Sequence, residues 1–309
     1  MLLWHDAIVL ATTHGRLIEG VMVQSLRPAG PSLRSQWLGQ RIKQLRVEHQ
    51  VPMAEIAEFL DMAQSTMSRI ENALSAIKRG DLKELLTFYN ADEETREQLL
   101  YLRDIAWRRD WWDGSTDGGQ VSSFADYAWL ESRALTIRAY GILVISGLFQ
   151  TAEYAEAVIR DSAIQGESAH RIDEWVSLRL RRQEILTKSD PPTLDVVLDE
   201  SALRRRFGGP KVMRAQLENL VRLAALDHVT IRVLPFTHTL HSGYEGTFSY
   251  FTLEEPYPDV AYSESAVSQM FVETPKKLDH LERVFTLLSG SALPSDESVR
   301  FISAIAKEL

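Results

Sequence analysis

Three short segments between residues 38 and 71 each carry a single stripe of apolar residues at helical spacing. In the middle segment Met53, Ile56, Ala57 and Leu60 recur at i, i+3, i+4 and i+7, the pattern of one helix face. The first segment, 38–49, and the third, 64–71, show similar spacing. Helices with such narrow stripes can bury them only against one another, so the pattern predicts a small helical bundle.

The third segment carries hydrogen-bonding side chains opposite its apolar stripe. Met67 and Ile70 must point inward, and the outward positions are then Gln64, Ser65, Ser68 and Arg69. Only a few residues around Asp61 separate this segment from the one before it, which is the connection length of a helix-turn-helix. Glutamine can bond adenine, and arginine can bond guanine, through two hydrogen bonds each. This face is therefore suited to read bases in a DNA groove.

The stretches LGQRIKQLR, AEIAEFL and QSTMSRIEN resemble, in order and spacing, the Cro and phage-repressor class of helix-turn-helix proteins, often called the XRE family. The resemblance implies that Gln64, Ser65 and Arg69 meet base edges, and that Thr66 and Ser68 contact phosphates or bases. It also implies a structural ion pair between Arg46 and Glu71, which joins the first and third helices. Lys78 and Arg79, just past the third helix, are predicted to contact phosphates, which position a protein without reading sequence.

Two positions depart from the pattern of that family. Pro52 and Met53 stand where the second helix commonly begins with Thr-Gln, so one polar contact to DNA is predicted to be missing. Proline is accepted in a first helical turn, so the helix itself is expected to form. Ala63 stands where a capping serine is common, which forgoes roughly 1 kcal/mol at the helix end. The alternative interpretation is a helical bundle that does not bind DNA, but the combined spacing and motifs favour DNA binding.

The chain is acidic overall, with 34 Lys and Arg against 43 Asp and Glu and a net charge of -9. This balance argues against a general nucleic-acid coat and against binding to an anionic membrane. Residues 33–80 instead carry seven bases against five acids. We therefore expect modest affinity per monomer, strong salt dependence and a homodimer on double-stranded DNA. The chain has no cysteine and no run of about 20 apolar residues, which favours a cytoplasmic protein without disulfides or thiolate zinc sites.

Two further helices are predicted to complete a five-helix DNA-binding domain over residues 33–112. Asp81 with Glu84 predicts a helix through Tyr89, and Asp92 predicts another to about Arg109. Residues 1–32 are expected to be a flexible N-terminal extension. Glycine and serine accumulate over 113–123, which predicts a linker. Packing anchors at this junction are predicted at Trp107, Trp111 and Trp112.

Residues 124–309 are predicted to form an α+β domain. Short strand-like runs such as TLDVVL, TIRVLPF, GTFSYFTL and DVAYSE are interspersed with helical segments. Consecutive short strands joined by turns favour a mostly antiparallel sheet with helices on one face. A long helix over 167–188 carries several arginines, which are interpreted as a solvated face with internal ion pairs; an auxiliary DNA surface is the alternative.

A second resemblance covers this part of the chain. The stretches WLESRALTIRAYGILVISGLFQTAEYAEAVI, RLRRQEIL, LDESALRRRFGG and VAYSE look like the uncharacterised effector domain of actinobacterial WhiJ-like and Scr-type regulators. In that family the gene commonly lies beside one for a very small partner protein, in an arrangement likened to toxin and antitoxin pairs. The resemblance thus implies a transcription factor that responds to a small protein partner.

Candidate catalytic chemistry is sparse. His238 and His241 are three residues apart in a loop without a nearby third ligand, so a metal site is not expected. Glu200 and Arg204 are better explained as an ion pair, and Glu264 as a structural hydrogen-bond acceptor. No phosphate-binding loop or nucleophile elbow is present in the sequence. We expect no enzyme, metal or cofactor.

Two hypotheses about function follow from the sequence. The first is a dimeric transcriptional regulator that is switched through its C-terminal domain by a small protein or ligand. The second is an antitoxin-like adaptor that sequesters a small protein and binds DNA only for autoregulation. A bound metabolite would favour the first hypothesis, and stable co-purification of a small polypeptide would favour the second.

Overall fold

The structure is a computed structural model of the chain, and it describes residues 31–106, 121–162, 169–238, 241–255, 257–265 and 269–309. Residues 1–30 of the predicted N-terminal extension lie outside the described residues. The predicted anchors Trp107, Trp111 and Trp112 also lie outside them, as do residues 113–120 of the predicted linker. The last three residues of that linker, 121–123, form the first turn of a helix.

The N-terminal region is a bundle of helices around one apolar core. Its helices are α1 (Leu33–Glu48), α2 (Met53–Phe59), α3 (Gln64–Glu71), α4 (Arg79–Phe88) and α5 (Glu93–Ala106). Ile42, Ile56 and Met67 from the first three helices are fully buried in this core, as their spacing predicts. Two helix starts differ from the prediction. Helix α1 begins at Leu33 rather than Leu38, because Ser32 caps it, and α4 begins at Arg79 rather than Asp81.

Four helix ends in this bundle place a residue other than glycine in the left-handed backbone region. These residues, Gln50, Asp61, Ala73 and Asn90, have φ between 48° and 58° and follow α1, α2, α3 and α4. At the end of α1, the Val51 N–H bonds to the Arg46 carbonyl and the Gln50 N–H to the Val47 carbonyl, both at 3.0 Å. This paired bonding satisfies carbonyls at the end of the helix and turns the chain sharply.

The C-terminal region is an α+β domain. Its longer helices are α6 (Val121–Arg133), α7 (Ala152–Ser162), α8 (Ala169–Arg182), α10 (Pro210–Leu223), α11 (Pro275–Ser291) and α12 (Ser295–Glu308). Short helical turns occur at η1 (Gly147–Phe149), η2 (Gln183–Leu186), α9 (Glu200–Arg204) and η3 (Ser242–Glu245). The strands are β1 (Ala134–Gly141), β2 (Thr193–Asp199), β3 (Val229–Leu234), β4 (Phe248–Leu253), β5 (Val260–Glu264) and β6 (Gln269–Val272).

The six strands form a mixed sheet in the order β3-β2-β1-β4-β5-β6. Strands β1, β2 and β3 are parallel, while β4, β5 and β6 continue the sheet with antiparallel pairing. The prediction of a mostly antiparallel sheet was therefore wrong. The reason is that helices separate β1 from β2 and β2 from β3, and a crossover through a helix returns the chain parallel to the strand it left.

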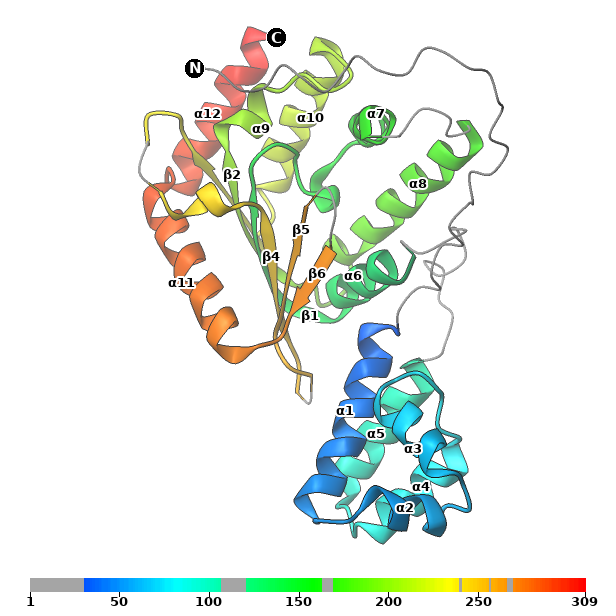
Figure 1. Cartoon of the computed structure of the whole chain (residues 1–309). Coiled ribbons are helices and arrows are strands. Elements are labelled where there is room, and N and C mark those ends of the chain that lie inside the picture. The colour runs from blue at the N-terminus through cyan, green and yellow to red at the C-terminus, as the bar shows by residue number, and fades with distance from the viewer. Residues whose placement is uncertain (1–30, 107–120, 163–168, 239–240, 256, 266–268) are drawn as a thin grey trace, which may run out of the picture.

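Helices cover both faces of this sheet, not one face as predicted (Figure 1). On one face, Phe285 and Leu288 of α11 pack with Tyr140, Val197 and Phe248 from three strands. The other face packs against helices that include α6, α10 and α12. Alternate residues of β1 face these two layers, which is why Ala139 and Tyr140 belong to different clusters. Among the described residues, no helix combines the length and apolar character needed to cross a membrane.

Replacing Gln50 with glycine should stabilise the N-terminal bundle. A left-handed conformation costs an L residue about 1–2 kcal/mol, and the greater freedom of glycine in the unfolded chain cancels part of that gain. We expect urea denaturation to show a rise of roughly 0.5 kcal/mol in the free energy of unfolding. The matched control, Glu48→Gly, lies inside the last turn of α1 and should lose about 1 kcal/mol. Equal losses in both variants would contradict this account of the turn.

Candidate DNA-binding interface

Helix α3 buries one face and exposes the other. Met67 is fully buried and Ile70 is 4% exposed, whereas Gln64, Ser65, Thr66 and Arg69 are exposed and Ser68 is partly exposed. The helix begins without a side-chain cap, because Ala63 at the N-cap position has no polar atom to offer. All five side chains of α3 that were predicted to contact DNA are thus at least partly open to solvent.

Arg69 is held back against its own chain. Its Nε donates to Ser75 Oγ at 3.0 Å, and its Nη2 donates to the Leu74 carbonyl at 3.2 Å. Both contacts are exposed, and exposed hydrogen bonds contribute little net free energy because water replaces them. A guanine edge can therefore compete for this guanidinium at small cost.

The two predicted phosphate contacts differ in their surroundings. Arg79 is exposed and forms an ion pair with Asp104 of α5, which also receives Arg103 Nη1 at 3.1 Å. Lys78 is exposed at the N-cap position of α4 and has no ion pair within the described residues. Since Asp104 offsets part of the charge of Arg79, Lys78 is the stronger of the two candidates for a phosphate contact.

Helix α1 fixes the position of α3 through a glycine and an ion pair. A Cβ atom on Gly39 would lie 2.6 Å from the Glu71 carbonyl oxygen, so only glycine permits this approach of the two helices. Arg46 Nε and Nη2 bond to the two carboxylate oxygens of Glu71 at 2.6 and 3.0 Å. The hydrogen bonds that Arg46 donates to Glu71 raise the pKa of the Arg46 guanidinium. Arg46 also donates to the Val51 carbonyl at 3.2 Å, which ties in the start of α2.

The other end of α1 is anchored in the C-terminal domain. Asp126 of α6 accepts the Leu33 N–H at 2.7 Å, and Arg34 Nε lies 3.7 Å from its other carboxylate oxygen. Arg34 and Asp126 are only 2% and 3% exposed. A carboxylate at a helix N-terminus is favourable because the first N–H groups have no partner within the helix. The α6 helix therefore caps α1 from outside.

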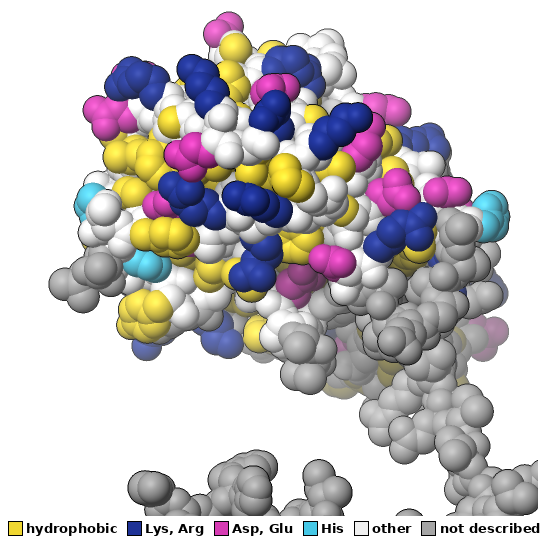
Figure 2. All heavy atoms as spheres, turned by 90° about the horizontal axis from the view of Figure 1, so that it is seen from above, with side chains coloured by type: hydrophobic (Ala, Val, Ile, Leu, Met, Phe, Trp, Pro, Cys, Tyr) yellow, Lys and Arg dark blue, Asp and Glu magenta, His cyan; other side chains and the backbone are white. Residues whose placement is uncertain are grey.

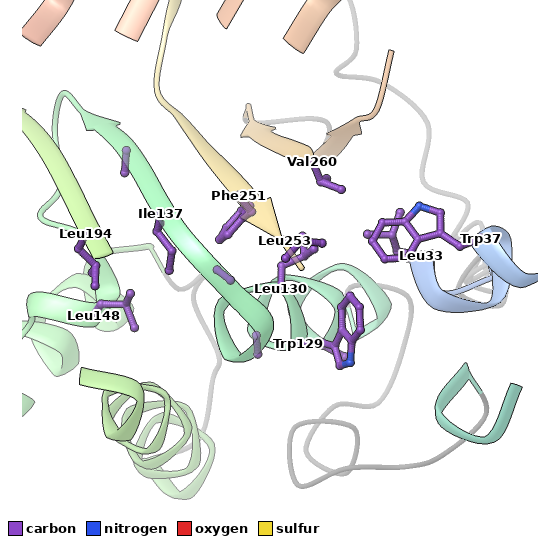
Figure 3. Packing of buried hydrophobic residues seen from close by; sticks show 14 of the residues in the cluster. Leu33, Trp37, Trp129, Leu130, Ile137, Leu148, Leu194, Phe251, Leu253 and Val260 are labelled. Atoms are coloured by element: carbon purple, nitrogen blue, oxygen red, sulfur yellow. The ribbon is translucent and has the colours of Figure 1, made fainter. Parts of the chain in front are cut away.

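An aromatic cluster completes this domain junction (Figure 3). Trp37 of α1 lies 5.6 Å from Trp129 of α6 and 5.7 Å from Tyr257, measured between ring centroids. The Trp37 indole Nε1–H donates to Glu273 Oε2 at 2.6 Å. Burial raises the pKa of Glu273, and the hydrogen bond from Trp37 opposes that shift. Figure 3 shows Leu33 and Trp37 beside Val260 and Leu253, so the core of the sheet continues into α1.

The arginines of α8 are not all solvated, contrary to the prediction for residues 167–188. Arg182 is buried and forms a bidentate ion pair with Glu131 of α6, with distances of 2.6 and 2.7 Å. Its guanidinium lies over the rings of Phe124 and Tyr127, at 5.3 and 5.1 Å from their centroids. On the same helix, burial lowers the pKa of Arg179 to about 10. These contacts join α8 to the helix that caps α1.

The remaining candidate groups are either bound to structural partners or exposed to solvent. His241 Nδ1 accepts the Gly243 N–H at 3.1 Å, and His238 is exposed. Glu264 accepts the Tyr262 hydroxyl at 2.7 Å, and Arg204 is paired with Glu200. Within the described residues, no group of three or more His, Cys, Asp or Glu side chains is arranged to hold a metal ion.

The sequence pattern did not identify the junction residues Asp126, Trp129 and Glu273. The sequence did contain one indication of this junction. Leu33 and Trp37 extend the apolar stripe of α1 toward its N-terminus at helical spacing. If the first helix is predicted to begin at Leu33, its N-terminal end carries apolar residues that the helical bundle does not cover. Such residues predict a contact with another part of the chain. The partners themselves are distant in sequence, and Glu273 lies 236 residues from Trp37.

Two family models match the chain. One, described as a helix-turn-helix domain, matches residues 37–99. The other, described as a domain of unknown function (DUF5753), matches residues 124–304. No curated protein and no solved structure matches the chain.

Replacing Gly39 with alanine should loosen the contact between α1 and α3. The added methyl group meets backbone rather than a flexible side chain, so the helices must separate, and overpacking of this kind typically costs about 1–3 kcal/mol. Gly80→Ala is the control, because a Cβ there meets no atom within 4 Å. Thermal denaturation should show a lower midpoint for Gly39→Ala alone. An unchanged midpoint would mean that the close approach does not matter for stability.

Replacing Glu273 with glutamine should stabilise the domain junction at neutral pH. The amide oxygen retains an acceptor for Trp37, while the desolvated negative charge is removed. Since the folded-state pKa of Glu273 is raised, the folded protein binds the proton more tightly, and stability falls as pH rises above the ordinary value of 4.5. Denaturation curves of the two proteins should therefore converge below about pH 4.5 and separate above it. A variant that is less stable at every pH would contradict this assignment.

Proposed function

Because the chain belongs to the family of the domain of unknown function DUF5753, here preceded by a helix-turn-helix domain, we propose that it is a sequence-specific transcriptional regulator controlled through its C-terminal domain. The observation that carries the proposal is the outward face of α3, where Gln64 and Arg69 are exposed while Met67 is buried. These are the side chains best able to distinguish adenine and guanine in the major groove.

The proposed DNA complex places α3 of two copies in successive major grooves. Two half-sites one helical turn apart, about 34–36 Å, suit a dimer with two-fold symmetry. Lys78 and Arg79 then contact phosphates beside the recognition helix. A dimer also offsets the small number of cations on each copy, because each neutralised phosphate releases counterions and adds affinity. This arrangement is the one expected for XRE-type repressors, which the helix-turn-helix sequence resembles.

The proposed control acts through α1. Its N-terminal half contacts Asp126, Trp129 and Glu273 of the C-terminal domain, and its C-terminal half contacts Glu71 of α3. A ligand or small partner protein can bind one arrangement of this junction more tightly than another. It then increases the fraction of molecules in that arrangement, and α1 carries the change to the position of α3. The resemblance to WhiJ-like regulators supports a small partner protein. We propose no enzymatic reaction for either domain.

An antitoxin-like adaptor is the second candidate. Large apolar side chains remain exposed on the C-terminal domain, among them Leu143 at 49% and Phe236 at 55%. Exposed apolar groups of this size favour a surface that binds another protein. In this alternative the C-terminal domain sequesters the partner, and DNA binding serves only autoregulation. The two candidates share the DNA contact face and differ in which binding event has the biological effect.

The double variant Gln64→Ala, Arg69→Ala tests the contact face. An operator is first selected from random duplexes with the full-length protein, and binding is then measured by fluorescence anisotropy at fixed salt. Each bidentate base contact contributes about 1–3 kcal/mol of discrimination. Loss of two contacts should therefore reduce the preference for the operator by about 30-fold or more. Circular dichroism should remain unchanged, because both side chains are exposed.

The matched control is Gln98→Ala, Arg283→Ala, which removes the same residue types from α5 and α11. It should keep full operator preference. If the α3 variant also keeps it, the proposed contact face is wrong. If the wild-type protein selects no sequence, the proposal of a sequence-specific regulator fails.

A further inference from the structure

One end of the C-terminal domain carries exposed cations that form no ion pair among the described residues. The parallel strands β1, β2 and β3 finish there, and α9, the start of α10 and the end of α12 surround them (Figure 1). Its exposed cations are Arg205, Arg206, Lys211, Arg214 and Lys307. None of these five forms an ion pair with another described residue, whereas neighbouring Arg204 is paired with both Glu200 and Glu308. Figure 2 shows this end, with Lys and Arg side chains set among hydrophobic ones.

A groove between α10 and α12 lies within this cationic end. Its volume is about 500 Å³, and Val221 and Ala306 line it with apolar atoms. Arg214 and Lys307 line it with positive charge, and Ser303 and the single acid Glu218 complete the lining. The two helices pack against each other on the same side of the sheet, and the groove lies between residues 214–221 of α10 and 303–307 of α12. A groove with an apolar lining and charged borders suits one face of an amphipathic helix.

Two exposed apolar side chains lie at loops whose backbones bond to α9. Leu143 follows β1, where Ser201 Oγ donates to the Ile142 carbonyl at 2.5 Å. Phe236 follows β3, and its N–H donates to Glu200 Oε2 at 2.8 Å. Their backbones are therefore fixed by the corner between β2 and α9, while their side chains remain in water. Fixed apolar groups lose little conformational entropy on binding, which makes them good anchors for a partner.

We propose that this end of the C-terminal domain is a docking surface for an acidic amphipathic helix of a partner protein. The apolar side of the helix enters the groove between α10 and α12, and its acidic side pairs with Arg206, Lys211 and Arg214. Opposite charge speeds and orients this association, and the exposed apolar anchors hold the complex. The surface carries arginines and the aromatic side chain of Phe236, residue types that are enriched in protein interfaces.

Operator DNA is a poor occupant for this surface. In Figure 1 the bundle that contains α3 lies at one end of the molecule, and α9, α10 and α12 lie at the other. A duplex seated on α3 does not reach the groove without strong bending, which costs several kcal/mol for short DNA. This inference rests on the proposed function only for the effect of the partner on the regulator. Binding of the partner helix to the groove itself requires no DNA.

The test uses the full-length protein and a fluorescein-labelled peptide of about 18 residues, roughly five helical turns, with leucine on one face and glutamate on the other. Anisotropy should show saturable binding that weakens by about tenfold or more between 50 and 300 mM salt, because several ion pairs form. Three comparison probes are a peptide with lysine in place of glutamate, an oligoglutamate without leucine, and a DNA duplex of unrelated sequence. All three should bind at least about tenfold more weakly.

The triple variant Arg206→Glu, Lys211→Glu, Arg214→Glu should weaken peptide binding by about 100-fold or more, since attraction becomes repulsion at three positions. Ser303→Trp should block the groove without changing charge. The control Lys188→Glu, Lys276→Glu, Arg283→Glu produces the same change in net charge elsewhere and should bind the peptide within about threefold of wild type. The triple variant should keep its selected operator preference, which separates this inference from the DNA contact face.

Three outcomes would overturn the docking surface. The first is an equal loss of peptide binding in the charge-reversal variant and its control, because net charge alone would then explain the interaction. The second is equal affinity for oligoglutamate, because the groove would then play no part. The third is tighter binding of the DNA duplex than of the acidic peptide, if the triple variant abolishes that duplex binding. The surface would then be a nucleic-acid site.

Discussion

The structure depends on a single helix, α1, whose two halves pack in different domains. Helix α1 contributes Ile42 and Leu45 to the N-terminal bundle, and it contributes Leu33 and Trp37 to the core that continues into the sheet. Its 16 residues span about 24 Å at 1.5 Å per residue. Because a helix keeps its internal hydrogen bonds, a displacement at one end is carried to the other rather than absorbed within it.

Each end of α1 is held by an ion pair in poorly hydrated surroundings. At the N-terminal end Arg34 meets Asp126, and at the C-terminal end Arg46 meets Glu71. Such pairs add little net stability compared with apolar packing, but separating one leaves a buried charge uncompensated, which is strongly unfavourable. The pairs therefore restrict α1 to arrangements in which both are formed. The control proposed above therefore acts by shifting α1 between packed arrangements, rather than by loosening it gradually.

Charge is distributed unevenly along the molecule. The chain has a net charge of -9, yet both surfaces proposed to bind partners present cations or hydrogen-bond donors. The face of α3 offers an amide and a guanidinium, and the far end of the C-terminal domain offers five cations without ion pairs within the described part of the chain. Because the net charge of the whole chain is negative, binding of DNA or of an acidic protein depends on such local groups.

The sequence by itself determined the local elements and the face of α3. Helical spacing predicted the buried Met67 and the exposed Gln64. The strand-like runs TLDVVL, TIRVLPF, GTFSYFTL and DVAYSE correspond to β2, β3, β4 and β5. These features depend on residues a few positions apart, whose relation is set by the repeat of a helix or strand. The mixed direction of the sheet, the burial of Arg182 against Glu131 and the contact of Trp37 with Glu273 were decided by tertiary structure. Those contacts join residues far apart in the chain, and no local period encodes which of them meet.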